Sequence, residues 1–174
     1  MKLSRRGVLA TGGGLAASLL AVGSGGAAGP VEILMRGSKD GGRISFDPIG
    51  LFVEPGQRIR FVNRDAGNTH TATTYAPAID DRPLRIPSGA KAWDSDYLDP
   101  GQSFEVALDL PGVYDFYCRP HEHAGMVGRI VVGRAGQATG WEQNQETGDL
   151  EPELLANFPE VDRIVAAGRV APDW

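Results

Sequence analysis

Short runs of alternating apolar and polar residues recur through the middle of the chain, and turn-forming residues separate them. Glycine, proline and aspartate gather between the runs, as in Glu54–Gln57, Asp99–Gln102 and Pro111-Gly112. Period-two alternation bounded by such turns is typical of half-buried strands. The strands that it predicts are Val31–Met35, Ile44–Val53, Arg58–Asn63, Phe104–Leu108, Val113–Cys118 and Gly128–Gly133. Several short strands separated by turns favour an all-β sandwich or barrel.

The pattern changes after Gly133. Residues 134–149 are polar and indicate a linker. Apolar residues then recur at helical spacing, at Leu154, Leu155, Phe158, Val161, Ile164 and Val165. Pro159 interrupts this stripe, so we expect two short helices in 150–174, the second starting at Pro159 and ending before Gly168. We expect this segment to pack back on the sandwich; a docking element for a partner protein is the alternative.

Length and charge narrow the choice of partners. The chain has 174 residues, with 24 glycines and 12 prolines, which suits one turn-rich domain with additional segments. Without Lys2, Arg5 and Arg6, the only charged residues before position 29, 14 basic side chains face 22 acidic ones, a net charge of −8. Such a surface disfavours binding to nucleic acid and anionic membranes and suits a basic protein partner. A role of the negative charge in keeping the protein soluble accounts for it equally well. We expect a monomer.

The N-terminus resembles an export signal. The paired arginines Arg5 and Arg6 precede a stretch over 8–22 rich in glycine, alanine and leucine, and small residues fill 23–29. This order is typical of a secretory signal, and the twin arginine indicates the export route for folded proteins. A retained anchor is the alternative, but a spanning helix prefers about 20 apolar residues. We expect a twin-arginine signal over 1–28 that is cleaved, a periplasmic or other extracytoplasmic location, and no stable membrane insertion afterwards.

The chemistry-bearing residues gather in one short run. The single cysteine, Cys118, is followed by His121 and then by Met126, and His70 lies far upstream. Thiolate and thioether are soft donors that favour copper, and two His, one Cys and a weak axial Met form the blue-copper electron-transfer ligand set. We therefore predict one copper ion held by these four residues. Metal ligation also accounts for an odd thiol in an oxidising compartment.

Other chemistries fit this chain less well. Taken alone, a cysteine or a methionine is usually apolar filling in a core. A Cys–His nucleophile and base would lack the surrounding Asn or Asp, and a copper enzyme would need a second set of histidines, so we expect no enzyme. A zinc site would need Cys118 and all three histidines, yet His121 and His123 face opposite ways in an extended segment. We expect His123 to be a solvated loop histidine that does not bind the metal.

The run that carries Cys118, His121 and Met126 resembles a known family of copper proteins. The run Tyr117-Cys118-x-Pro120-His121-x-x-x-Gly125-Met126, followed by Gly128–Val132, resembles the copper loop of the cupredoxins, in particular the plastocyanin, pseudoazurin and halocyanin group. The first-ligand half of the same family is resembled by Phe52–Gln57, Phe61–Asn63 and Asn68–His70. The resemblance implies a Greek-key β-sandwich over 29–133 with a type 1 copper ligated by His70, Cys118, His121 and Met126.

The resemblance also implies a function and shows two departures. It implies an electron carrier that cycles between Cu(II) and Cu(I) and serves a c-type cytochrome or a terminal oxidase or reductase. A periplasmic copper carrier or storage protein is the alternative. Thr71 stands where many relatives have asparagine, so the hydrogen bond that this asparagine makes beside the metal is in doubt here. The segment 75–93 is longer than the minimal fold requires. Tyr117 is either a second electron exit or simply a core aromatic.

Overall fold

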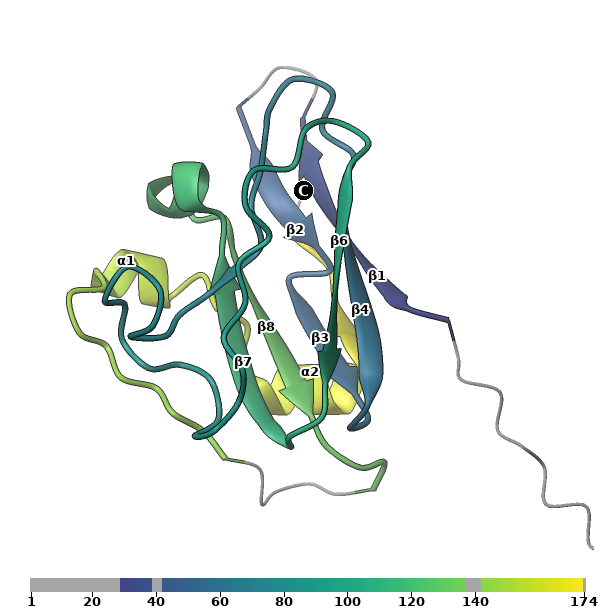
Figure 1. Ribbon diagram of the computed structural model, residues 1–174, viewed down its shortest axis with the longest axis vertical. Helices are drawn as coiled ribbons and strands as arrows, with labels where there is room; N and C mark the ends of the chain where they lie inside the picture. Colours follow the sequence, from purple (N-terminus) through teal and green to yellow (C-terminus); the bar gives the residue numbers. More distant parts are fainter. Residues whose placement is uncertain (1–28, 39–41, 137–141, 174) are drawn as a thin grey trace, which may run out of the picture.

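Two β-sheets packed face to face form the body of the protein (Figure 1). The computed structural model describes residues 29–38, 42–136 and 142–173, so the expected signal over 1–28 lies outside the described residues. The first sheet has the order β2 (Ile44–Asp47), β1 (Val31–Gly37), β4 (Gln57–Asn63) and β6 (Ser103–Leu108). The second has the order β5 (Thr73–Thr74), β7 (Gly112–Tyr117), β8 (Val127–Val132), β3 (Gly50–Val53) and β9 (Arg169–Val170).

Aromatic rings from both sheets interlock in the core. Phe46 on β2 and Phe61 on β4 both meet Phe116 on β7 edge to face, with ring centroids 4.7 and 5.2 Å apart. All three side chains are fully buried, and such pairs add about 0.5–1.5 kcal/mol each beyond the apolar area that they bury. The predicted all-β sandwich is confirmed.

One predicted strand is divided between the two sheets. The sequence pattern predicts a single strand over Ile44–Val53, but β2 pairs with β1 in the first sheet and β3 pairs with β8 in the second. The chain crosses between the sheets at Pro48, which lacks the N–H that a continuous ladder requires. The strands β5 and β9 have two residues each, too few for an alternating pattern to reveal them.

The C-terminal segment packs on the outer face of the second sheet, as expected. Helix α1 spans Pro152–Leu155 and α2 spans Val161–Ala167, so the second helix begins two residues later than predicted and ends before Gly168. Ile164 of α2 is fully buried in a cluster with Val113 and Val131, and β9 pairs with β3. No helix among the described residues is both long and apolar enough to cross a membrane.

A buried ion cluster joins the additional segments to the sheet. Asp115 on β7 is fully buried and pairs with Arg129 on β8 and with Arg85 from the long 75–93 segment, at 2.7 Å in each case. Both guanidinium groups lie about 5 Å from the Phe158 ring, at 5.0 and 5.2 Å. Arg129 also donates to the carbonyl of Pro159, at 3.0 Å. The cluster thus holds the C-terminal segment and the inserted segment on the same face.

The stretch expected to be a linker is tied down where it is described. The side chain of Glu142 accepts from the backbone N–H of Ser88 at 2.8 Å, and the carbonyl of Glu146 accepts from Arg85 at 2.9 Å. These bonds give 142–149 a fixed course along the 75–93 segment. Its polar composition reflects its position on the surface rather than freedom from the domain.

Candidate metal centre

The first expected ligand, His70, is held by the backbone at the end of a loop after β4. Its N–H donates to the carbonyl of Leu98 at 3.1 Å, and its carbonyl accepts from the N–H of Leu98 at 2.8 Å. The His70 side chain has no exposed surface. A residue that is paired with a neighbouring segment in both directions has little freedom to move, so this imidazole is positioned by the scaffold.

The other three expected ligands lie on one tight loop between β7 and β8. Cys118 follows β7, the 3-10 helix η1 spans Arg119–Ala124, and Gly125 closes it in the left-handed region at φ 82°. The N–H of Cys118 donates to the carbonyl of Met126 at 3.0 Å, and the N–H of Met126 donates to the carbonyl of His121 at 3.1 Å. The loop therefore folds back on itself and brings its ligands to the pole where His70 lies.

Three donor atoms converge at this pole. The Cys118 Sγ lies 3.5 Å from the His70 Nδ1 and 3.4 Å from the His121 Nδ1, and the two Nδ1 atoms are 3.1 Å apart. This triangle fits one ion with metal–nitrogen and metal–sulfur bonds of about 2.0–2.3 Å. Met126 is fully buried and bonded through its backbone to both Cys118 and His121, and it stays the predicted axial ligand.

The sequence matches a known family over most of this domain. Residues 33–133 match the family model for copper-binding proteins of the plastocyanin/azurin family. The chain belongs to this family. It is 38% identical to plastocyanin of Cucumis sativus over 104 residues, 59% of this chain and 99% of that protein. It is also 38% identical to chloroplastic plastocyanin of Oryza sativa subsp. indica over 105 residues, 58% of this chain and 62% of that protein's length.

A solved structure is similar as well. Native pseudoazurin from Hyphomicrobium denitrificans matches with a TM-score of 0.47 and 22% identity, over 60% of this chain and 76% of that chain. Family membership shows copper as the metal of this chain. His70, Cys118 and His121, whose donor atoms converge, remain the predicted ligands together with Met126.

A carboxylate that was not predicted from the sequence lies beside the predicted ligand His70. His70 Nε2 lies 3.0 Å from Asp65 Oδ2, and the Asp65 carboxylate also accepts from the N–H of Gly67 at 2.9 Å and from Asn68 at 2.8 Å. Burial alone would raise the pKa of Asp65, but these hydrogen bonds outweigh it and hold that pKa below its usual value. A carboxylate at Nε2 fixes the tautomer, which leaves the Nδ1 lone pair free for the metal.

Thr71 supplies the hydrogen bond that its departure from the family pattern put in question. The N–H of Arg119, next to the cysteine, donates to Thr71 Oγ1 at 2.9 Å. The N–H of Thr71 itself points at the Cys118 sulfur, 3.3 Å away. One threonine thus joins the first-ligand segment to the copper loop of this family member in two places.

Burial sets the protonation of the donors in the metal-free site. It raises the pKa of Cys118 to about 11, although the N–H groups of Thr71 and His121 oppose the shift. Burial and the neighbouring His70 lower the pKa of His121. Near neutral pH the metal-free site therefore holds a thiol and a neutral His121 imidazole, whose lone pair is available to copper.

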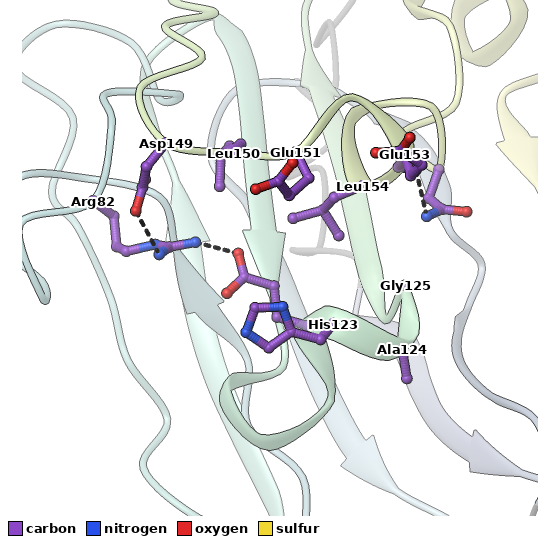
Figure 2. A pocket seen from close by; sticks show the side chains of 11 residues that line it. Arg82, His123, Ala124, Gly125, Asp149, Leu150, Glu151, Glu153 and Leu154 are labelled. Atoms are coloured by element: carbon purple, nitrogen blue, oxygen red, sulfur yellow. Dashed lines mark hydrogen bonds and ion pairs between the residues drawn. The ribbon is translucent and has the colours of Figure 1, made fainter.

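The loop is anchored on its far side by a buried acid. Glu122 of η1 accepts a 2.7 Å hydrogen bond from the Tyr75 hydroxyl and pairs with Arg82. The Arg82 guanidinium lies 5.4 Å from the Tyr75 ring and 5.3 Å from the ring of Tyr117. Arg82 and Glu122 line a cavity of about 710 Å³ together with the exposed His123, and Figure 2 shows Arg82 and His123 at this cavity. Among the described residues, His123 takes no part in the donor triangle.

Proposed function

We propose that this protein is an exported type 1 copper protein that carries single electrons between redox partners. The observation that supports this most directly is a converging Cys–His–His donor set whose His70 and Cys118 are fully buried. Copper bound there supplies one-electron chemistry through its Cu(II) and Cu(I) states. With Met126 as the predicted axial ligand, the protein itself fills the coordination positions and leaves none for a substrate.

The scaffold favours rapid electron transfer because it holds the ligands in one geometry. His70 is fixed by its backbone pairing with Leu98 and by the Asp65 carboxylate. The loop is fixed by its internal hydrogen bonds and by the Glu122 anchor. Donors that are positioned before the metal binds change little between its two oxidation states, so the reorganisation required for each transfer is small.

We propose that electrons leave through His121 rather than through Tyr117. His121 is partly exposed, and its neighbours Pro120 and Ala124 are exposed and uncharged. Tyr117 is 2% exposed and lies beneath Tyr75, its ring centroid 4.4 Å away. A partner protein can therefore approach the imidazole edge, while the tyrosine side is covered.

The partner and the compartment follow from charge and from the N-terminus. Without residues 1–28 the chain carries 14 basic and 22 acidic side chains, which suits a partner with a basic face. We propose a c-type cytochrome or a terminal oxidase or reductase as that partner. The twin-arginine pattern supports export of the folded chain to the periplasm or a comparable extracytoplasmic space.

The visible spectrum of the purified protein with added Cu(II) tests this proposal. We expect an intense thiolate-to-copper band that a reductant bleaches reversibly and that the Cys118→Ser variant lacks. Stopped-flow mixing of the reduced protein with an oxidised, basic c-type cytochrome then tests electron transfer. A protein that binds copper without this band, or that returns copper to a metal-free acceptor instead of passing electrons, would contradict the proposal and favour a copper carrier or storage protein.

A further inference from the structure

The Asp65–His70 pair is built into the interior rather than placed at the surface. Asp65 is 7% exposed and His70 is fully buried. The backbone of Asp65 is fixed because its N–H donates to the side chain of Asn63 at 2.9 Å. The same Asn63 amide donates to the carbonyls of Asn68 and Leu98, at 2.8 Å each. The backbones around Asp65 and His70 are therefore held by one hydrogen-bond network centred on the Asn63 side chain.

A glycine makes room for the carboxylate. A Cβ at Gly37, the last residue of β1, would lie 2.3 Å from Asp65 Oδ2 and 2.9 Å from Oδ1. Only a residue without a side chain lets the carboxylate lie against this strand end. The first sheet is thus shaped to accept Asp65 in the one position from which it reaches His70.

The Asp65 carboxylate lies next to the His70 imidazole. Within the described residues Asp65 has no ion pair with arginine or lysine, and its only charged or chargeable partner is His70. The other histidine differs, because no described residue is hydrogen-bonded to the Nε2 of His121. The two imidazoles thus present chemically different donors to one metal.

We propose that Asp65 is a positioning residue that, through His70, stabilises oxidised copper and lowers the reduction potential of the site. This inference rests on the proposed type 1 copper function. A carboxylate that accepts a hydrogen bond from the Nε2–H makes the Nδ1 lone pair a stronger donor and places a negative charge behind the ring. Both effects favour Cu(II) over Cu(I), because the ion with the larger charge gains more from each.

The test compares Asp65→Asn with Asp99→Asn in the copper-loaded protein. Asp99 is exposed and follows Leu98, whose backbone pairs with His70, so its variant makes the same change of charge near the site without touching the imidazole. We expect the potential of Asp65→Asn to shift to more positive values and its Cu(II) affinity to fall about 10- to 100-fold, with a smaller loss for Cu(I). Asp99→Asn should leave both quantities unchanged.

The unmodified protein provides a second, independent readout. In the reduced, diamagnetic form, we expect the Nε2–H of His70 to appear as a slowly exchanging proton signal. An Asp65→Asn variant with an unchanged potential, or a His70 Nε2 without a proton, would overturn the role of Asp65. If these results came from a protein with the blue band, the proposed function would stand. Loss of the band from the unmodified protein would remove the proposed function and this inference with it.

Discussion

The two ligand-bearing segments of this copper site are held by different means. His70 is fixed by backbone pairing and by a carboxylate behind its ring, and it has no exposed surface. The Cys118–Met126 loop is folded by its own short-range bonds and is anchored by side chains from distant segments. The His70 segment is therefore rigid and buried, and the Cys118–Met126 loop presents a partly exposed imidazole. The proposed electron transfer needs both, since one segment must hold the metal still and the other must meet a partner.

Deleting each imidazole in turn is the strongest test of this difference between the two segments. Both His70→Gly and His121→Gly should lose the blue band. Added imidazole should restore it in His121→Gly at a concentration at least about tenfold lower than in His70→Gly, because the cavity at 121 opens to solvent. Tenfold corresponds to about 1.4 kcal/mol. Titration of the visible band with imidazole measures this. Equal rescue of the two variants would show that the two sides are equally accessible.

Phe158→Ala tests how much the C-terminal segment contributes to stability without acting on the metal site. Phe158 is 5% exposed and covers the guanidinium groups of Arg85 and Arg129. Its removal should cost about 3–5 kcal/mol of unfolding free energy, while the position of the blue band should not change. Urea unfolding of the metal-free protein measures the loss. Leu155→Ala, at a partly buried position, is the control and should cost clearly less.

Thr71→Val removes the side-chain link between the two segments and leaves the backbone contact to the Cys118 sulfur in place. It leaves the part-buried N–H of Arg119 without its acceptor, so we expect a loss of about 1–3 kcal/mol of unfolding free energy and faster copper release. Thr69→Val, at an exposed position beside the same histidine, should change neither quantity. Unfolding curves and the rate of copper transfer to a chelator provide the two measurements. A Thr71→Val variant as stable as the control would show that the threonine side chain does not hold the two segments together.

Tyr75→Phe should have the smallest effect. It removes one hydrogen bond to Glu122 but leaves the ion pair with Arg82 in place, so we expect a loss of about 1 kcal/mol. Tyr97→Phe, which alters a tyrosine that is 55% exposed, is the matched control. The same unfolding measurement applies. A loss well above that of Thr71→Val would reverse the order of the two anchors.

The sequence predicted the elements whose signal is local. Alternation along six stretches predicted most strands, and the Cys118–Met126 spacing predicted a copper loop because ligand type and spacing are both visible in the letters. Asp65 was not predicted because the Asp65–Asn68 stretch also suits an ordinary turn, and only the folded loop brings it to His70. The Glu122 anchor could not be predicted either, since its partners Tyr75 and Arg82 lie 47 and 40 residues away in the sequence.

The complete burial of Cys118 has a consequence for the life of the protein before copper arrives. The chain folds around a thiol that has no exposed surface and whose pKa is raised to about 11. A buried, protonated thiol is a poor nucleophile and is out of reach of disulfide exchange. We therefore expect the Cys118 thiol of the metal-free protein to react only slowly with disulfides and oxidants before the metal binds.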